Sequence, residues 1–190
     1  KLGAKVDPEI AFPGQRAYEV VKPLVELLHP DVDGKANYDA LVTLTNLASK
    51  SDSVRKRILK ERATPKIEEF WFMTDHEHLR AAAAELLLNL LFNDDYCKEV
   101  VRKGTDRMKL WILYAAEVED PRLSQASAAG FVILTEEEGI APRILEEVKT
   151  WPEVFKEIAM HEDPETQRRG LMAIANLMDA DEKFCAEIVA

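Results

Sequence analysis

The chain has 190 residues, of which 47% are hydrophobic and 32% charged, and its formal net charge is −10. This mixture is typical of a folded, soluble protein and argues against a disordered one. The negative charge also argues against a nucleic-acid partner, because such a protein needs a dense basic stripe to displace counterions from phosphates. No apolar run approaches the ~20 residues that a membrane span needs, so we expect no membrane partner.

Helices of recurring length are predicted along the chain, because few Gly or Pro residues interrupt it and no strand-length alternation of apolar and polar residues occurs. The predicted helices fall, in chain order, at 15–28, 34–50, 53–61, 65–72, 76–93, 96–103, 107–116, 120–137, 140–148, 152–160, 163–179 and 181–189. The fold class is therefore all-α, with short, medium and long helices alternating.

The long helices repeat one pattern, in which Asn46, Asn89, Ile133 and Asn176 are equivalent and follow one another at steps of 43, 44 and 43 residues. Thirteen residues before these positions stand Asp33, His76, Asp120 and Asp163, and Asp is a preferred residue at helix N-termini. Pro follows the last two Asp residues, at the first helical position, where its missing N–H does no harm.

A period of 43–44 residues with three helices per cycle matches the armadillo plan better than two-helix repeats. Because a single repeat cannot bury its own apolar faces, neighbours must stack. We expect residues 1–190 to form a single armadillo solenoid, a right-handed superhelix of about four repeats with a concave groove lined by its long third helices. The aromatic residues of the second helices are interpreted as core between repeats; they are Trp71, Phe72, Trp111, Tyr114, Trp151 and Phe155.

Residues that could carry chemistry are scattered. His76 and His78 are two apart and cannot share a metal as an i, i+4 pair would, while His29 and His161 lie at helix ends. No phosphate loop, nucleophile elbow or paired acid and base is present. The sequence therefore predicts no enzyme, no metal and no cofactor.

Two further features have ordinary interpretations. The basic run over 55–62 is interrupted by Glu61 and reads as a solvated helix face. Cys97 and Cys185 form no disulfide framework, which indicates a reducing compartment. Because the chain lacks an initiator Met and stops within the last predicted helix, we expect it to be a fragment of a longer cytosolic protein.

Asn46, Asn89 and Asn176 offer two interpretations. A carboxamide can bind both the N–H and the C=O of an extended peptide, so a ladder of them could hold a client main chain. Alternatively, each Asn bonds a neighbouring segment and fixes the stacking of the repeats. The sequence does not decide between these two roles.

Several blocks are more specific than a generic armadillo repeat. They are FPGQRAYEVVKPLVELLHP (12–30), YDALVTLTNLA (38–48), RILKERATPKIEEFWF (57–72), HEHLRAAAAELLLNLLF (76–92) and GTDRMKLWILYAAE (104–117). Together they closely resemble the carboxy-terminal part of the UCS (Unc/Cro/She) domain of animal myosin chaperones. The resemblance covers nearly the whole chain and weakens after Glu136.

The resemblance implies a myosin-directed chaperone module of the cytoplasm, sarcomere-associated in muscle forms, that binds the myosin motor domain and aids its folding, assembly and protection from aggregation. Family members dock the ninety-kilodalton heat-shock chaperone through another domain, absent here. On this basis the client-binding groove is assigned to third-helix positions, namely Tyr38, Asn46, Glu85, Asn89 and Asn176. End-to-end self-association of chains is left open.

One departure from the wider armadillo superfamily bears on the alternatives. Nuclear-import receptors place a Trp one turn before the ladder Asn, whereas here these positions are Val42, Glu85, Ala129 and Met172. Nuclear-signal binding is therefore not expected. The alternatives to a myosin chaperone are a generic armadillo adaptor for a linear peptide motif and a scaffold whose groove packs against its own chain.

Overall fold

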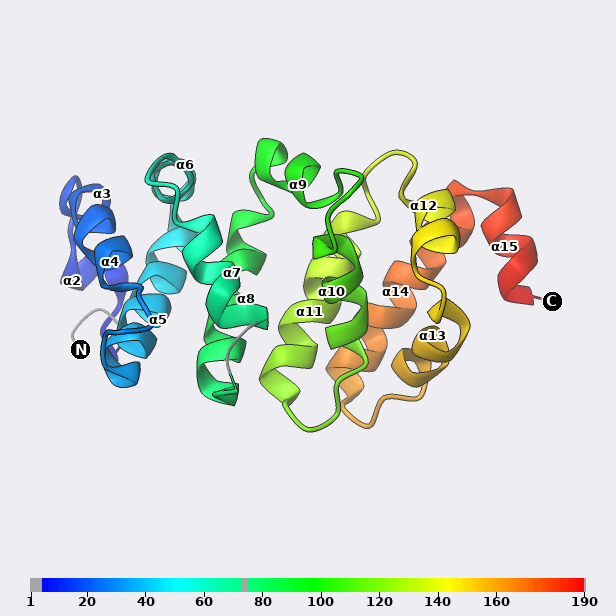
Figure 1. Cartoon of the computed structure of the whole chain (residues 1–190). Helices are drawn as coiled ribbons and strands as arrows, with labels where there is room; N and C mark the ends of the chain where they lie inside the picture. The colour runs from blue at the N-terminus through cyan, green and yellow to red at the C-terminus, as the bar shows by residue number, and fades with distance from the viewer. Residues whose placement is uncertain (1–4, 73–74, 190) are drawn as a thin grey trace. The chain divides into compact units, whose positions relative to one another are not determined.

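The computed structural model describes residues 5–72 and 75–189, and every regular element in these ranges is a helix (Figure 1). The described chain divides after Tyr96 into two compact units, called unit 1 and unit 2 below. In unit 1 the helices are α2 (Pro8–Ala11), α3 (Arg16–Glu19), α4 (Val21–Leu27), α5 (Gly34–Lys50), α6 (Asp52–Lys60), α7 (Thr64–Phe72) and α8 (Glu77–Leu90). After α9 (Asp94–Val100), unit 2 contains α10 (Arg107–Ala115), α11 (Pro121–Leu134), α12 (Ile140–Glu147), α13 (Trp151–Ala159), α14 (Pro164–Ala180) and α15 (Glu182–Val189).

The four predicted long helices are α5, α8, α11 and α14, and three of them begin as their sequence indicates. The carboxylate of Asp33 accepts a hydrogen bond from the N–H of Ala36, and that of Asp163 accepts one from Thr166. Asp120 accepts from two backbone N–H groups at the start of α11. These N-caps satisfy donors that a helix start leaves without partners. The bond from the Thr166 N–H is also the main cause of the lowered pKa of Asp163.

The main departures concern helix ends. The helix predicted over 15–28 is divided into α3 and α4, because Pro23 has no N–H to donate to the carbonyl of Glu19. His76 precedes α8 without a side-chain cap. The long helix predicted over 120–137 is α11, and it ends at Leu134. A turn follows at Gly139, whose φ of 76° favours glycine.

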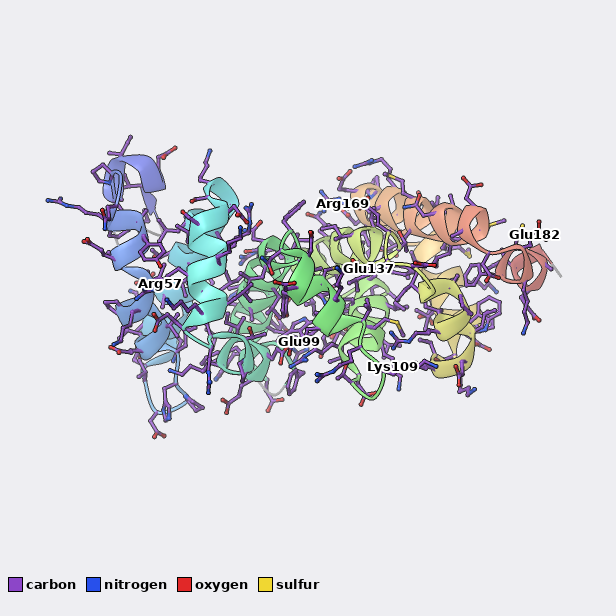
Figure 2. The ribbon with its side chains drawn as sticks, turned by 90° about the horizontal axis from the view of Figure 1, so that it is seen from above. Arg57, Glu99, Lys109, Glu137, Arg169 and Glu182 are labelled. Atoms are coloured by element: carbon purple, nitrogen blue, oxygen red, sulfur yellow. The ribbon has the colours of Figure 1, made fainter. Side chains whose placement is uncertain are left out.

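Unit 1 is built on the contact between α5 and α8, with α4 packed on the first and α7 on the second (Figure 1). Leu41, Leu44 and Leu86 are fully buried in it. The N-terminal helices are joined to α6 by Arg57, whose guanidinium lies 4.7 Å from the ring centroid of Tyr18 and pairs with Glu61 (Figure 2). The basic residue Arg57 is thus a packing and pairing group rather than a purely solvated one.

Asn37, which the sequence reasoning did not single out, fixes the corner between α4 and α5. Its side chain is buried, and its Oδ1 accepts a hydrogen bond from the N–H of His29 at 3.1 Å. Its Nδ2 donates to the carbonyls of His29 and Val32 at 3.0 and 2.9 Å. A buried amide with this set of partners orients the loop that leads into the first long helix.

Unit 2 has the corresponding arrangement, in which α11 packs against α10 and α14, and α13 packs against α14. Phe131, Phe155 and Phe184 are buried together. The ring centroid of Phe155 lies 5.8 Å from that of Phe131 and 5.9 Å from that of Phe184. Trp151 is partly buried beside them. Such tilted and edge contacts are the arrangements that aromatic pairs prefer.

Of the six aromatic residues assigned to the core, three are buried, and Tyr114 and Trp151 are half-buried. Trp71, Trp111 and Phe155 are buried, whereas Phe72 at the end of α7 is 44% exposed. No helix in the described ranges is long and apolar enough to cross a membrane.

Candidate functional site

Four of the five predicted client-binding residues lie on adjacent helices of unit 1. Tyr38 and Asn46 belong to α5, and Glu85 and Asn89 belong to α8, which packs directly against it. The eight-residue spacing of Tyr38 and Asn46 and the four-residue spacing of Glu85 and Asn89 place each pair on one side of its helix. All four side chains are half-buried, so each is partly accessible to a partner. The fifth residue, Asn176, is exposed on α14 of unit 2.

The asparagines take part in repeat stacking. Asn89 Nδ2 donates to the backbone carbonyl of Thr45 on the preceding long helix at 3.0 Å. In unit 2, Asn176 Nδ2 donates to the hydroxyl Oγ1 of Thr135, just after α11, also at 3.0 Å. These two bonds join segments 44 and 41 residues apart in sequence. The stacking interpretation therefore holds for Asn89 and Asn176.

The stacking bond leaves part of each amide available. Neither the Oδ1 of Asn89 nor that of Asn176 has a hydrogen-bond partner within residues 5–72 and 75–189. One N–H of each Nδ2 is used, so a second donor and the acceptor remain. An amide held in this way is fixed in orientation while it can still bind another main chain. Client binding by these residues stays a prediction.

An exposed aromatic residue lies next to the ladder, and the sequence reasoning missed it. Phe92 follows α8, three residues after Asn89, and is 59% exposed. The guanidinium of Arg55 lies 6.0 Å from its ring centroid, and the same guanidinium donates from Nη1 to the carbonyl of Ala48 at the end of α5. Exposed aromatic rings with an oriented cation beside them are frequent anchors in protein interfaces.

The accessible face of α14 is more strongly charged. Glu165 pairs with Arg168 at 2.8 Å and with Arg169 at 2.7 Å, and the hydrogen bond from Arg168 is the main cause of its lowered pKa. Arg169 also donates to the carbonyl of Gln125 on α11, so it contributes to stacking (Figure 2). Leu171 and Met172 are 46% and 44% exposed beside this cluster. The face therefore combines fixed charges with accessible apolar groups.

The histidines and acidic residues of the described chain are dispersed, and buried His161 has a structural position. Within the described part of the chain, no group of three His, Cys, Asp or Glu residues could hold a metal ion. His161 is buried, with its Nδ1 accepting from the N–H of Asp163 and its Nε2 2.8 Å from the carbonyl of Glu117. Both ring nitrogens thus serve to hold the turn before α14.

Replacing Asn89 by Ala is expected to lower the free energy of unfolding by about 1–3 kcal/mol, because the bond to the Thr45 carbonyl is lost. Asn176→Ala should cost less, since that residue is exposed and water can replace its partner. Thermal unfolding followed by circular dichroism measures both. Lys35→Ala, at an exposed position near the start of α5, is the control and should leave the midpoint unchanged. An unchanged midpoint for Asn89→Ala would remove the stacking role.

Comparison with known proteins agrees with the resemblance noted above. No family model matches the chain. UNC-45 homolog B of Danio rerio is 42% identical over 194 residues, an alignment that covers 100% of this chain and 20% of that protein. The chain thus spans about a fifth of the length of the curated relatives it matches.

Solved structures give the same result. A structure of the UNC-45 chaperone, described for binding and folding muscle myosin, superposes with a TM-score of 0.96 at 73% identity, covering 99% of this chain and 21% of that one. The myosin chaperone UNC-45 from C. elegans, in complex with an Hsp90 peptide, gives 0.93 at 74%, covering 98% and 21%. The chain therefore corresponds to part of the UCS region of UNC-45 proteins, and its fold is an armadillo-like helical solenoid.

Proposed function

We propose that this segment of the UCS region is a myosin-directed chaperone module, which binds the myosin motor domain in a concave groove lined by its third helices. One observation carries the proposal: the chain aligns along its whole length with UNC-45 chaperones and superposes on a structure described for binding and folding muscle myosin. Binding without catalysis is consistent with a site made of amides, one carboxylate and apolar side chains.

The chemistry of the proposed site suits a chaperone that must release its client. Half-buried amides bond a main chain whatever its side chains are, which allows broad tolerance of sequence. An extended client loses conformational entropy when it binds, so its affinity is low relative to the surface area that the complex buries. Phe92 and the neighbouring Leu88 add apolar contact for segments that an unfolding motor domain exposes.

The wider setting of the proposal concerns the longer protein. We propose that docking of the ninety-kilodalton heat-shock chaperone occurs through a domain outside this chain. The complex of the C. elegans relative with an Hsp90 peptide supports the chaperone as a partner of the longer protein. A cytoplasmic location, with association to the sarcomere in muscle, follows from a myosin client. End-to-end self-association would bring several such modules to one filament.

The proposal is tested by the light scattering of heated myosin heads, which this chain should reduce when it is present in molar excess. Phe92→Ser should weaken the suppression, because it removes the most exposed apolar group of the unit 1 face. Phe72→Ser is the matched control, since it removes an exposed Phe of the same unit from α7, which is the second helix of its repeat and not a third helix. Full aggregation in the presence of the unaltered chain would refute the proposal for this segment.

A further inference from the structure

A second surface, in unit 2, uses no residue of the third helices. It is a hollow of about 630 Å³ between the turn that follows α10 and the helix α13 with the turn after it. The hollow is lined by Ala116, Val118, Glu153, Lys156, Glu157, Met160, His161 and Glu162. We call it the α10–α13 hollow.

Two apolar residues of the lining, Val118 and Met160, are called here the apolar floor of the α10–α13 hollow, and both are open to solvent. Met160 is 70% exposed and Val118 is 61% exposed, which are high values for apolar side chains of this size. Both lie in the short turns that lead from a second helix to the next long helix. Their backbone is held by His161, whose ring nitrogens contact both turns. The two side chains are therefore presented from a fixed frame.

The rim of the hollow is acidic. Glu153 and Glu157 are one turn apart on α13, and Glu162 follows Met160 in the turn. None of these three carboxylates has an ion-pair partner within the part of the chain that the structure describes, and Lys156 is the single basic side chain of the lining. A cavity with unpaired charges of one sign around apolar groups has a definite electrostatic complement.

We propose that the α10–α13 hollow is a docking site for a short basic amphipathic helix of another protein. An aliphatic side chain of that helix packs between Val118 and Met160, while its Lys or Arg residues pair with the carboxylates of the rim. Glu153 and Glu157 on α13 and Met160 just after it span about two helical turns, roughly 10 Å, which matches two turns of a partner helix. Met suits such a surface because its flexible side chain adapts to different apolar groups.

The sign of the charge decides against other kinds of occupant. Phosphates of a nucleic acid or of an anionic membrane would meet three carboxylates, with a single Lys in compensation. The site is also independent of the proposed myosin-binding face. A variant of that face, Phe92→Ser, is therefore expected to leave peptide binding at the hollow unchanged, so the two proposals can fail separately.

The test is the fluorescence anisotropy of a labelled 14-residue amphipathic peptide of Leu and Lys, titrated with the chain. Glu153→Lys together with Glu157→Lys should weaken binding about tenfold or more, since attraction becomes repulsion at the rim. The double variant Glu136→Lys and Glu138→Lys changes the net charge of the chain by the same amount, but at positions that follow the C-terminal end of α11. It should change the affinity for the peptide less than about twofold. Equal losses in both double variants would show attraction by net charge alone and overturn the proposal.

The apolar floor is tested by Met160→Ser, which leaves the charge unchanged and should weaken binding about fivefold at constant ionic strength. An unchanged affinity would overturn the proposal, because only the acidic rim would then act. A peptide with Glu in place of Lys should not bind. If the rim variants instead abolish a dimer seen by sedimentation, the occupant is a second copy of the chain and the proposal of a basic helix fails.

Discussion

Replacing Trp111 by Ala is expected to lower the free energy of unfolding by about 3–5 kcal/mol, the usual cost of truncating a fully buried large aromatic residue. Trp111 belongs to α10 and is completely buried, and its indole ring lies against the backbone of α11 at Gly130. Its removal leaves a cavity that two packed helices cannot close without moving. Chemical denaturation followed by circular dichroism measures the loss.

A control for this prediction is Trp151→Ala. Trp151 is only partly buried, although it contacts Phe155 and Phe184 at its edge of the core, so its truncation should cost clearly less. If both Trp variants lost the same stability, burial of the indole on Gly130 would not be the source of the effect. A Trp111→Ala chain with an unchanged midpoint would contradict the packing of α10 on α11.

The second large effect is expected for Gly130→Ala, in which a single methyl group is added. On Gly130 that methyl would lie 2.5 Å from Cζ3 of Trp111, 3.0 Å from Cδ2 and nearer still to Cε3. The ring is rigid and buried, so the helices must separate, at a cost of about 1–3 kcal/mol or more. Gly34→Ala is the matched control, because nothing lies within 4 Å of its added methyl at the start of α5. That variant should be neutral or more stable.

The two substitutions should not be additive, and this tests the contact itself. In the double variant the methyl at position 130 enters space that the indole no longer fills, so the combined loss should be smaller than the sum of the single losses. Simple additivity would mean that Gly130 and Trp111 act independently, contrary to the geometry.

The parts of the fold that the sequence predicted depend on local chemistry. Asp33, Asp120 and Asp163 cap their helices as expected, because the side chain and the N–H groups it accepts from lie within three residues. The division of the first helix at Val20 was equally local and could have been anticipated from the missing N–H of Pro23. The UCS resemblance was confirmed because it depends on long continuous blocks of sequence.

What the sequence could not predict depends on contacts between repeats. The Asn ladder was visible as a period, yet the period alone could not show that Asn89 and Asn176 donate to Thr45 and Thr135. Nothing in a Leu-rich run that ends in Phe indicates that Phe92 is exposed while its neighbour Leu91 is buried. Likewise the contact of Gly130 with Trp111 joins two helices and leaves no trace in either segment alone.

The most direct measurement of the central claim, that third-helix faces bind a myosin motor domain, is site-specific photo-crosslinking to heated myosin heads. A photoreactive residue in place of Glu85 on α8 should give an abundant crosslinked product, and one in place of Val42 on α5 should do the same. The same probe in place of Glu26, which is exposed on α4 and does not belong to a third helix, should give little crosslinked product. Strong crosslinking from position 26 with none from positions 42 and 85 would contradict the account.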